Sequence, residues 1–207
     1  MHLPVPRTLL VLHAHSGDES ATTGGALALY SRQGVRTVLV TCTGPAQNPE
    51  LQAAADVLGV TDLEALGYLD SGEDGEVGQG GFCAIPVNIA ASRVAALVER
   101  YRPQVVVTHH GAHRDHVHAV RVAKSAVYRT GIPAKLYLTA GGGATTIDID
   151  DVADVKRKAV QCYPGRYAEG AFAVQEHYFR DLDTTNAPLP ETDLFAGVTN
   201  CGPDLPR

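Results

Sequence analysis

The sequence predicts an α/β protein with a Rossmann-like parallel sheet and helices on both faces. Short apolar runs rich in β-branched residues alternate with longer segments of helical periodicity, which is typical of βαβ units around a parallel sheet. The chain has 207 residues, of which 44% are hydrophobic and 19% charged, as in an ordinary globular protein. We therefore expect one large domain, with residues 1–165 as its main part and residues 166–207 as a C-terminal extension of the same domain.

The first part of the chain predicts three strands and two helices. We expect a first helix over residues 24–33 that ends at Gly34. A second helix begins after Asn48 and Pro49, a typical N-cap and first-turn pair, and ends at Gly59. The expected strands, where β-branched residues and leucine are concentrated, are residues 8–14, 35–42 and 63–66.

The second part begins with a long loop. Residues 71–81 hold five glycines and three acidic residues without periodicity. The next helix ends before Pro103, because the residue that precedes a proline disfavours helical geometry. Residues 141–143 are three glycines and predict a turn. The remaining expected elements are helices within residues 90–101, 117–127 and 151–161, strands at residues 105–107 and 134–140, and a short strand at residues 171–175.

Charge and cysteine content restrict the expected partners. Seventeen Lys and Arg against 23 Asp and Glu give a net charge of -6, so no excess positive field is available for nucleic acid. No apolar stretch approaches the roughly 20 residues of a membrane helix, and the N-terminal residues do not resemble a signal peptide. The four cysteines form no Cys-x-x-Cys pair. We expect a cytoplasmic protein that acts on a small molecule and binds neither nucleic acid nor membrane.

Histidines are concentrated where two of the predicted strands end. In an open parallel sheet, the loops at the carboxyl ends of the strands bind ligands. His15 and Asp18 lie three residues apart on a tight turn, and His116 would complete a three-ligand site with an open position. Such a set suits Zn²⁺, which lowers the pKa of its bound water to about 7, and also suits Fe²⁺. The two clusters are His13 and His15, and then His109, His110, His113, His116 and His118.

Two alternatives remain for these clusters. The simplest is that the residues are polar members of surface loops, because His, Asp and Ser commonly form turns. Seven histidines at two strand ends favour a metal site over that interpretation. A dinucleotide-binding domain is disfavoured, because no Gly-x-Gly-x-x-Gly follows the first strand.

Five segments in order resemble one known family. Residues 9–19 look like the strand and the His-x-Asp-Asp-Glu loop of the LmbE/PIG-L family of zinc-dependent N-acetylglucosaminyl deacetylases and amidases. Residues 103–118 are similar to the family's strand followed by His-x-Asp-His. Weaker matches are Gly24-Gly25, residues 40–44 and residues 66–72. The resemblance extends from about residue 8 to residue 160 and implies the family's α/β fold.

The resemblance also implies the roles of individual residues. His15, Asp18 and His116 match the metal ligands. His113 matches the histidine that stabilises the oxyanion or protonates the departing amine. Asp115 matches the acid that orients His113, and a carboxylate beside an imidazole fixes its tautomer and raises its pKa.

The substrate side shows both matches and departures. Asp70 and Ser71 match positions near the sugar, and the opening residues most resemble the actinobacterial branch that acts on cysteinyl-glucosamine-inositol thiols and their conjugates. Gly17 stands where the family usually has the Asp that acts as general base, and a glycine cannot accept a proton. Leu69 stands where that branch often has an Arg, and the family's Ser-Gln is absent around residues 164–166.

These observations lead to two functional hypotheses. The first is a zinc-dependent hydrolase that cleaves an amide, by N-deacetylation or a related deacylation, of a small polar substrate such as an N-acyl amino sugar or an amino-thiol conjugate. Glu19 is the first candidate for the missing base, followed by His113 in a dual role and by the substrate itself. The second hypothesis, supported by Gly17, is a metal-binding relative that has lost or altered hydrolysis. A homo-oligomer is compatible with either hypothesis.

The other histidines have more ordinary expected roles. His118 lies one turn inside a predicted helix and is expected at the surface or behind the ligands. His13 is expected behind the site or packed in the core. At most one of His109 and His110 can line the site, because they face opposite sides of a strand end. His177 is expected to face solvent.

Overall fold

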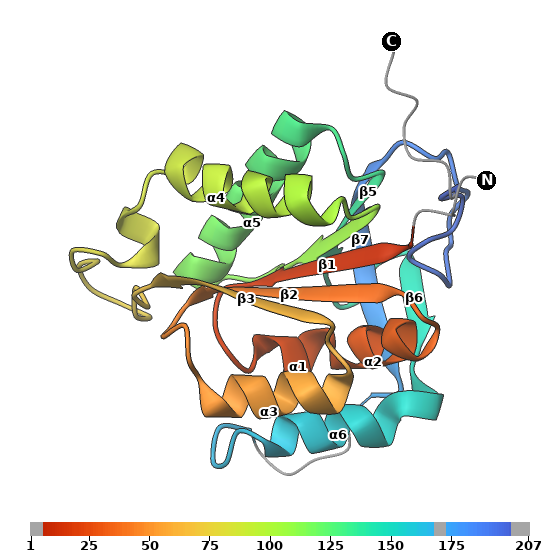
Figure 1. Ribbon diagram of the computed structural model, residues 1–207, viewed down its shortest axis with the longest axis horizontal. Helices are drawn as coiled ribbons and strands as arrows, with labels where there is room; N and C mark the ends of the chain where they lie inside the picture. Colours follow the sequence, from red (N-terminus) through yellow and green to blue (C-terminus); the bar gives the residue numbers. More distant parts are fainter. Residues whose placement is uncertain (1–5, 168–172, 200–207) are drawn as a thin grey trace.

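The structure is a computed structural model that describes residues 6–167 and 173–199. Its strands form one sheet in the order β3-β2-β1-β4-β5-β7-β6 (Figure 1). Strands β1 to β5 are parallel, whereas β7 is antiparallel to both β5 and β6. In chain order the strands are β1 (Thr8–His13), β2 (Arg36–Thr43), β3 (Asp62–Tyr68), β4 (Val105–Thr108), β5 (Lys135–Thr139), β6 (Thr145–Asp148) and β7 (Gln175–Asp183).

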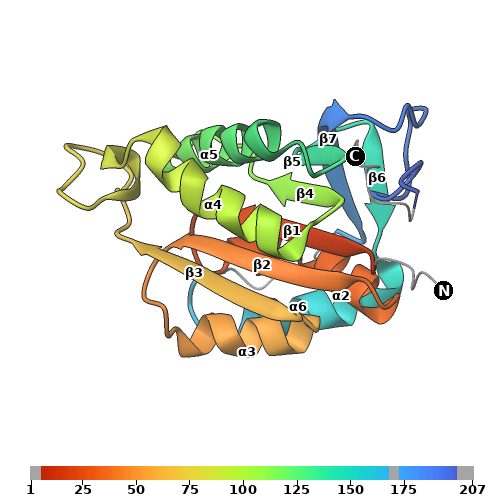
Figure 2. The ribbon, with the colours of Figure 1, turned by 45° about the horizontal axis from the view of Figure 1, so that its top comes forward.

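Helices cover both faces of the sheet, as the sequence predicts. Helices α2, α3 and α6 lie on one face with the short α1, and α4 and α5 pack together on the other (Figures 1 and 2). The helices are α1 (Asp18–Thr22), α2 (Gly24–Arg32), α3 (Pro49–Leu58), α4 (Val87–Tyr101), α5 (Arg114–Thr130) and α6 (Ala153–Gln161), with single 3₁₀ turns η1 (Phe82–Ala84) and η2 (Asp150–Val152).

The central strand β1 is apolar and buried on both sides. Its side chains alternate between the two faces of the sheet. Leu9 and Val11 belong to the core beneath α2, α3 and α6, whereas Leu10 and Leu12 belong to the core beneath α4 and α5. All four side chains are fully buried. Strand β1 is therefore fixed in register, because a one-residue slip would exchange the two sets of side chains.

Local signals define the ends of α3 as expected. The side chain of Asn48 accepts hydrogen bonds from the backbone N–H groups of Glu50 and Leu51, and Pro49 occupies the first turn. Gly59 closes the helix at a φ of 72°, a left-handed conformation that glycine adopts without strain. The N-cap at Asn48 therefore fixes where α3 begins and where the loop between β2 and α3 ends. This loop lies beside the site described below.

Three elements differ from the sequence expectations. The sheet is mixed rather than wholly parallel, because β7 enters between β5 and β6 with the opposite direction. Strand β7 begins at Gln175, where the expected strand at residues 171–175 ends, and residues 171–172 lie outside the described residues. Strand β6 and the five-residue helix α1 were not expected. The division of the chain at residue 165 stays a prediction.

The chain reverses its direction of travel across the sheet at β1. Strands β2 and β3 follow on one side of β1, and β4 and β5 follow on the other. The loops after β1 and β4 therefore separate at a topological switch point, the usual position of a ligand site in such sheets. None of the helices in residues 6–167 and 173–199 has the length and apolar character needed to cross a bilayer.

Candidate metal centre and active site

The loop after β1 supplies the first group of polar side chains. His13 ends the strand, and the chain then turns at Gly17, whose φ is 96°. Helix α1 begins directly afterwards at Asp18. The backbone N–H of His15 donates to Asp18 Oδ2 over 2.8 Å, which closes the turn and holds both side chains at the same edge of the sheet.

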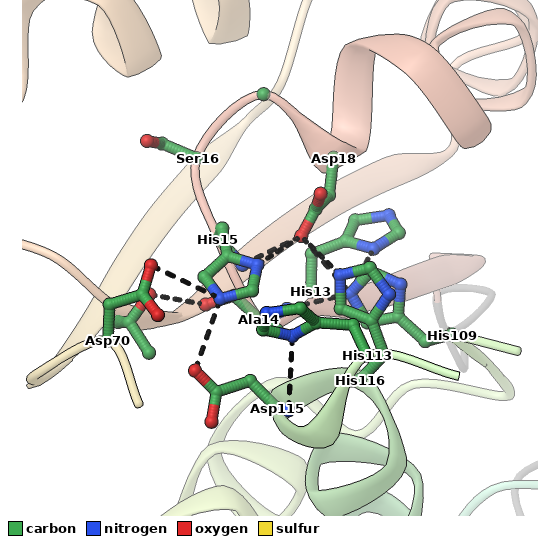
Figure 3. A network of polar contacts seen from close by, with 12 residues as sticks. His13, Ala14, His15, Ser16, Asp18, Asp70, His109, His113, Asp115 and His116 are labelled. Carbon is green, nitrogen blue, oxygen red and sulfur yellow. Dashed lines mark hydrogen bonds and ion pairs between the residues drawn. The ribbon is translucent and has the colours of Figure 1, made fainter. Parts of the chain in front are cut away.

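The loop after β4 and the start of α5 supply the second group. His109 directly follows β4 and is buried, whereas His110 is exposed. His113 caps α5: its Nδ1 accepts the backbone N–H of Asp115 at 3.2 Å. His116 follows within the first turn, and its ring stacks on that of His109 with centroids 3.9 Å apart. Imidazoles from two distant parts of the chain thus face the Asp18 side (Figure 3).

One oxygen of Asp18 lies among three imidazole nitrogens. Asp18 Oδ2 is 3.3 Å from His15 Nδ1, 3.3 Å from His109 Nε2 and 3.5 Å from His116 Nε2 (Figure 3). Burial alone would raise the pKa of Asp18, but the contacts of His116 and His15 lower it below its usual value. Asp18 is therefore a charged carboxylate in the folded protein at neutral pH.

The donor set fits a divalent cation. Neighbouring ligand atoms around a tetrahedral zinc ion lie about 3.4 Å apart when each is about 2.1 Å from the metal. The distances from Asp18 to His15 and His116 match this spacing. Nε2 of His109 already accepts the N–H of Ala14 at 2.8 Å, so it has no proton to share with Asp18. A carboxylate beside such an acceptor is unfavourable unless a cation lies nearby.

Three groups of side chains have donor atoms within 4.8 Å of one another, and two of these groups share His15. The three groups are His15, His113 and His116; His13, Asp18 and His109; and His15, Asp70 and Asp115. The expected ligands His15, Asp18 and His116 are spread over these groups and share Asp18 Oδ2 as their meeting point. The whole cluster, rather than one isolated triad, is therefore the candidate metal centre.

His13 and His109 form a hydrogen-bonded layer behind this centre. His13 Nδ1 lies 3.1 Å from His109 Nε2, and His13 Nε2 lies 2.9 Å from the hydroxyl of Thr23. Burial, followed by neighbouring imidazoles, lowers the pKa of His13 well below its usual value, and burial also lowers that of His109. Both rings are therefore neutral, and both nitrogens of His13 and Nε2 of His109 already have hydrogen-bond partners. Of the pair His109 and His110, only the first reaches the site.

In the structure the side chain of Asp115 contacts His15 rather than His113, the residue with which it was expected to pair. The carboxylate of Asp115 is fully buried, and its Oδ2 lies 3.2 Å from Nε2 of His15 and accepts the backbone N–H of Ser71 at 3.0 Å. Only the backbone N–H of Asp115 reaches His113, through the helix cap. The capping geometry turns the side chain of Asp115 across the site. Burial opposes its ionisation, yet the contacts of Ser71, Cys83 and His15 lower its pKa to about 2.

Glu19 lies beneath the loop rather than toward the centre. It is fully buried, and burial raises its pKa. Its Oε2 accepts the N–H of Gly17 at 2.7 Å, and its Oε1 accepts the hydroxyls of Ser20 at 2.7 Å and Tyr163 at 2.8 Å. Both oxygens are engaged in holding the turn at Gly17. This geometry favours a structural role over the role of general base expected from the sequence.

The space above Gly17 is occupied by the segment after α6. A Cβ atom on residue 17 would lie 2.7 Å from the hydroxyl of Tyr167 and 3.2 Å from a guanidinium nitrogen of Arg166. The positive φ of Gly17 is a second barrier to any other residue. The positive φ therefore favours glycine at this turn, and a side chain there would have to move the ends of Tyr167 and Arg166. Sequence reasoning missed Arg166 and Tyr167, because they follow the last predicted helix without any recognisable pattern.

A pocket of about 430 Å³ opens beside the centre. Asp70 lines it and is partly exposed, with Oδ2 3.6 Å from Nε2 of His15. Ser71 is buried instead: its backbone binds Asp115, and its hydroxyl accepts the N–H of Cys83 at 2.9 Å. The pocket's lining comes from the ends of β2 and β3, from the loops after β1, β2 and β3 and from Arg166 (His15, Ser16, Thr43, Gly44, Pro45, Asn48, Gly67, Tyr68, Leu69, Asp70 and Arg166).

The two outlying histidines lie away from this pocket. His118 is buried and packs edge-on against Phe82, with ring centroids 4.6 Å apart. His177 lies in β7, is half-buried and contacts the hydroxyl of Thr146 through Nδ1 at 3.0 Å. His177 therefore does not face solvent freely, because β6 is paired beside it.

Fold and site together define an α/β protein with a cluster of histidines and aspartates at the switch point of its sheet. The family model "PIG-L: GlcNAc-PI de-N-acetylase" matches residues 10–127, which is more than half of the chain. The chain belongs to this family. The family assignment expected from the sequence is thus confirmed.

Curated relatives are deacetylases. The chain is 37% identical over 169 residues to a 1D-myo-inositol 2-acetamido-2-deoxy-alpha-D-glucopyranoside deacetylase from Acidothermus cellulolyticus, a match covering 65% of this chain and 58% of the relative. An enzyme of the same description from Streptomyces avermitilis is 37% identical over 162 residues, covering 62% of this chain and 55% of the relative. The matches thus span little more than half the length of these relatives.

Solved structures share the fold. The conserved protein TT1542 from Thermus thermophilus is similar with a TM-score of 0.69 and 21% identity, covering 87% of this chain and 97% of that one. N,N'-diacetylchitobiose deacetylase from Pyrococcus horikoshii has a TM-score of 0.67 and 15% identity, covering 84% and 83%. The 4-carboxy-2-hydroxymuconate hydratase from Pseudomonas putida has a TM-score of 0.66 and 20% identity, covering 88% and 99%. At these identities the likeness concerns the fold alone.

Proposed function

We propose that this chain is a zinc-dependent hydrolase that removes an acyl group from the nitrogen of a small polar molecule. An N-acyl amino sugar or an amino-thiol conjugate is the expected substrate class. The observation that carries the proposal is the convergence of His15 and His116 on one oxygen of Asp18 beside an open pocket. Relatives named as deacetylases of an acetamido sugar linked to inositol support the reaction type.

The metal would be held by His15, Asp18 and His116. A zinc ion there supplies Lewis acidity to an amide carbonyl and to water. Asp115 and the N–H of His15 orient this set, because Asp115 contacts the ring of His15 and the N–H fixes Asp18. Fe²⁺ suits the same ligands, so the choice of zinc over iron is a separate and more specific part of the proposal.

In this proposal His113 stabilises the oxyanion. Its Nδ1 accepts the N–H of Asp115, so its Nε2 carries the proton of the neutral ring. The ring lies 4.9 Å from that of His15 and 5.0 Å from that of His116, centroid to centroid. A donor at this edge of the centre can bind the negative oxygen that develops when an amide is attacked.

Asp70 takes the role of proton acceptor in this proposal. Gly17 carries no carboxylate, and both oxygens of Glu19 are engaged. The side chain of Asp70 is 60% exposed, lines the pocket and lies 3.6 Å from Nε2 of His15. It is therefore a carboxylate at the centre that water and substrate can reach, as a general base requires.

Amine release by the zinc-loaded protein tests the proposal. A panel of N-acetylated amino sugars and amino-thiol conjugates would be incubated with wild type, His116→Ala and His177→Ala, with metal content measured in parallel. We expect free amine from wild type and His177→Ala, and loss of both metal and amine in His116→Ala. Retention of stoichiometric metal and turnover by His116→Ala would contradict the proposal.

A separate set of variants tests Asp70 as the general base. Asp70→Asn should lower kcat by roughly 10²- to 10⁴-fold, while Asp74→Asn in the same loop should retain it. Glu19→Gln separates the two candidate bases, because a loss of stability without a specific loss of kcat is expected there. A pH–rate profile of Asp70→Asn that keeps the acidic limb of wild type would refute this role.

A second candidate function rests on the glycine at position 17, where the family usually has the general base. Residue 17 carries no carboxylate, so this member of the family would use a bound metal for binding or for a reaction other than hydrolysis. A hydratase among the proteins of similar fold supports such a range of reactions. Stoichiometric metal without release of any amine would favour this candidate. The cytoplasmic location and any homo-oligomer stay predictions.

A further inference from the structure

Arg166 supplies a positive charge to the wall of the pocket beside the candidate metal centre. The other lining residues come from the ends of β2 and β3 and from the loops that follow β1, β2 and β3, whereas Arg166 comes from the segment that follows α6. The pocket is also lined by His15 and Asp70, so a molecule bound against Arg166 would lie beside the candidate ligands.

The guanidinium of Arg166 has no carboxylate partner within 4.0 Å in the described parts of the chain. Its aromatic neighbour is the ring of Tyr163, 5.9 Å from the guanidinium carbon. Asp70, the carboxylate of the pocket, is directed to His15 instead. The positive charge is therefore not neutralised by the described residues at this wall.

Gly17 keeps this arginine at the pocket. A Cβ atom at residue 17 would lie 3.2 Å and 3.3 Å from the guanidinium of Arg166 and 2.7 Å from the hydroxyl of Tyr167. Any larger residue would displace one of these groups, and the φ of 96° disfavours it as well. The glycine that removes a possible base thus creates the space that a cationic side chain fills.

We infer that Arg166 binds an anionic group of the substrate, a carboxylate or a phosphate carried by the acyl-amine molecule. The inference rests on the proposed function, because it assigns the substrate class of the same pocket. The planar guanidinium pairs with either anion through two parallel hydrogen bonds. Ser16 and Asn48, whose side chains are hydrogen-bonded at 3.2 Å, add uncharged polar groups to the wall. The pocket therefore suits an acidic amino sugar better than a neutral one.

Calorimetric titration of matched sugars tests the inference. The probes are glucosamine, glucosamine 6-phosphate and muramic acid, which share the amino sugar and differ in the anionic group. The proteins are zinc-loaded wild type, Arg166→Gln, Arg166→Lys and the control Arg129→Gln, an exposed arginine whose guanidinium donates to the hydroxyl of Ser92 at 2.7 Å. Release of amine from the three N-acetylated sugars is measured separately.

Wild type and Arg129→Gln are expected to bind one of the anionic sugars roughly 10- to 100-fold more tightly than glucosamine. Arg166→Gln should abolish this preference and leave glucosamine binding unchanged, and Arg166→Lys should restore part of it. The preferred probe identifies carboxylate or phosphate. Equal binding of all three sugars by wild type, or an equal loss for all three in Arg166→Gln, would overturn the inference.

The two proposals fail in different ways. A charge preference that depends on Arg166, without amine release from any N-acetylated sugar, would reject the hydrolase and retain the anion site. Amine release at equal kcat/KM from neutral and anionic sugars, unchanged in Arg166→Gln, would retain the hydrolase and reject the anion site.

Discussion

Asp115 and His15 are 100 residues apart in the chain, and their side chains meet at 3.2 Å between Oδ2 and Nε2. The contact joins the start of α5 to the loop after β1. It places a buried carboxylate, with a pKa of about 2, against the ring that also faces Asp18. A carboxylate in this position fixes the orientation and tautomer of an imidazole ligand.

Asp115→Asn should therefore weaken zinc binding by about 10- to 100-fold. Competition with a chromophoric chelator measures the affinity. Cys83→Ala is the matched control, because Cys83 Sγ contacts the other oxygen of Asp115, Oδ1, at 3.0 Å and leaves the oxygen that faces His15 untouched. Unchanged affinity in Asp115→Asn would show that the contact does not orient a metal ligand.

Gly17→Asp should destabilise the protein without restoring hydrolysis. The substitution places a non-glycine residue at a φ of 96° and directs its Cβ into the hydroxyl of Tyr167. We expect a loss of about 1–3 kcal/mol in the free energy of unfolding, measured by chemical denaturation. Gly17→Ala carries the same strain without the charge. The double variant Gly17→Ala/Tyr167→Phe should recover part of the loss. A large gain in kcat for Gly17→Asp at wild-type stability would contradict the claim that Tyr167 occupies the space above residue 17.

The fold could be predicted where strands are apolar and helices have clear ends. Strand β1 and helix α3 illustrate both cases, because their burial and caps are local in sequence. Strand β7 could not be predicted in the same way. Its buried residue Glu176 accepts the N–H groups of Gly25 and Ala26, about 150 residues away, and such a partner leaves no local pattern. Helix α1 is too short to show periodicity.

The sequence predicted which residues belong to the candidate site better than it predicted the contacts between them. His15, Asp18 and His116 follow two strands that the sheet places side by side, so their proximity follows from topology. The partner of Asp115 did not follow, because it depends on the cap of α5. Arg166 reaches the pocket only through tertiary packing and carried no sequence signal.

Glu191 contacts the neighbouring strands β5 and β7 and forms a buried ion pair with Lys135. It is 3% exposed and pairs with the fully buried Lys135, while Tyr137 donates to it at 2.8 Å and Arg180 at 3.0 Å. Burial alone would raise its pKa, but Lys135 and then Tyr137 lower it below the usual value. A depressed pKa means that the carboxylate adds stability above about pH 4.3 and loses it as the pH falls through the folded-state pKa.

Glu191→Gln should thus lower the free energy of unfolding by about 3–5 kcal/mol at pH 7. The difference from wild type should shrink as the pH falls from about 4.3 through the lowered folded-state pKa of Glu191. Asp154→Asn removes an exposed pair with Arg157 and should cost less than about 1 kcal/mol. Denaturation between pH 7 and pH 3 measures both. A Glu191→Gln difference that is constant over this range would contradict the assignment.

Zinc affinity should fall on mild acidification. Burial lowers the pKa of His15, but Asp18, Asp70 and Asp115 together raise it above 6.5 in the metal-free protein. Protons therefore begin to compete with the metal above about pH 6.5, while Asp18 stays charged. Calorimetry from pH 8 to pH 5.5 measures the decline. Asp70→Asn should shift its onset to lower pH, and an affinity that is flat over this range would refute the assignment of His15 as a ligand.

The most direct test is anomalous diffraction at the zinc edge from crystals of the zinc-loaded protein. The account predicts one strong peak bonded to a nitrogen of His15, to Asp18 and to a nitrogen of His116, each within about 2.0–2.3 Å. A peak held by His13 and His109 without His15 and His116, or no ordered metal at this edge of the sheet, would contradict it.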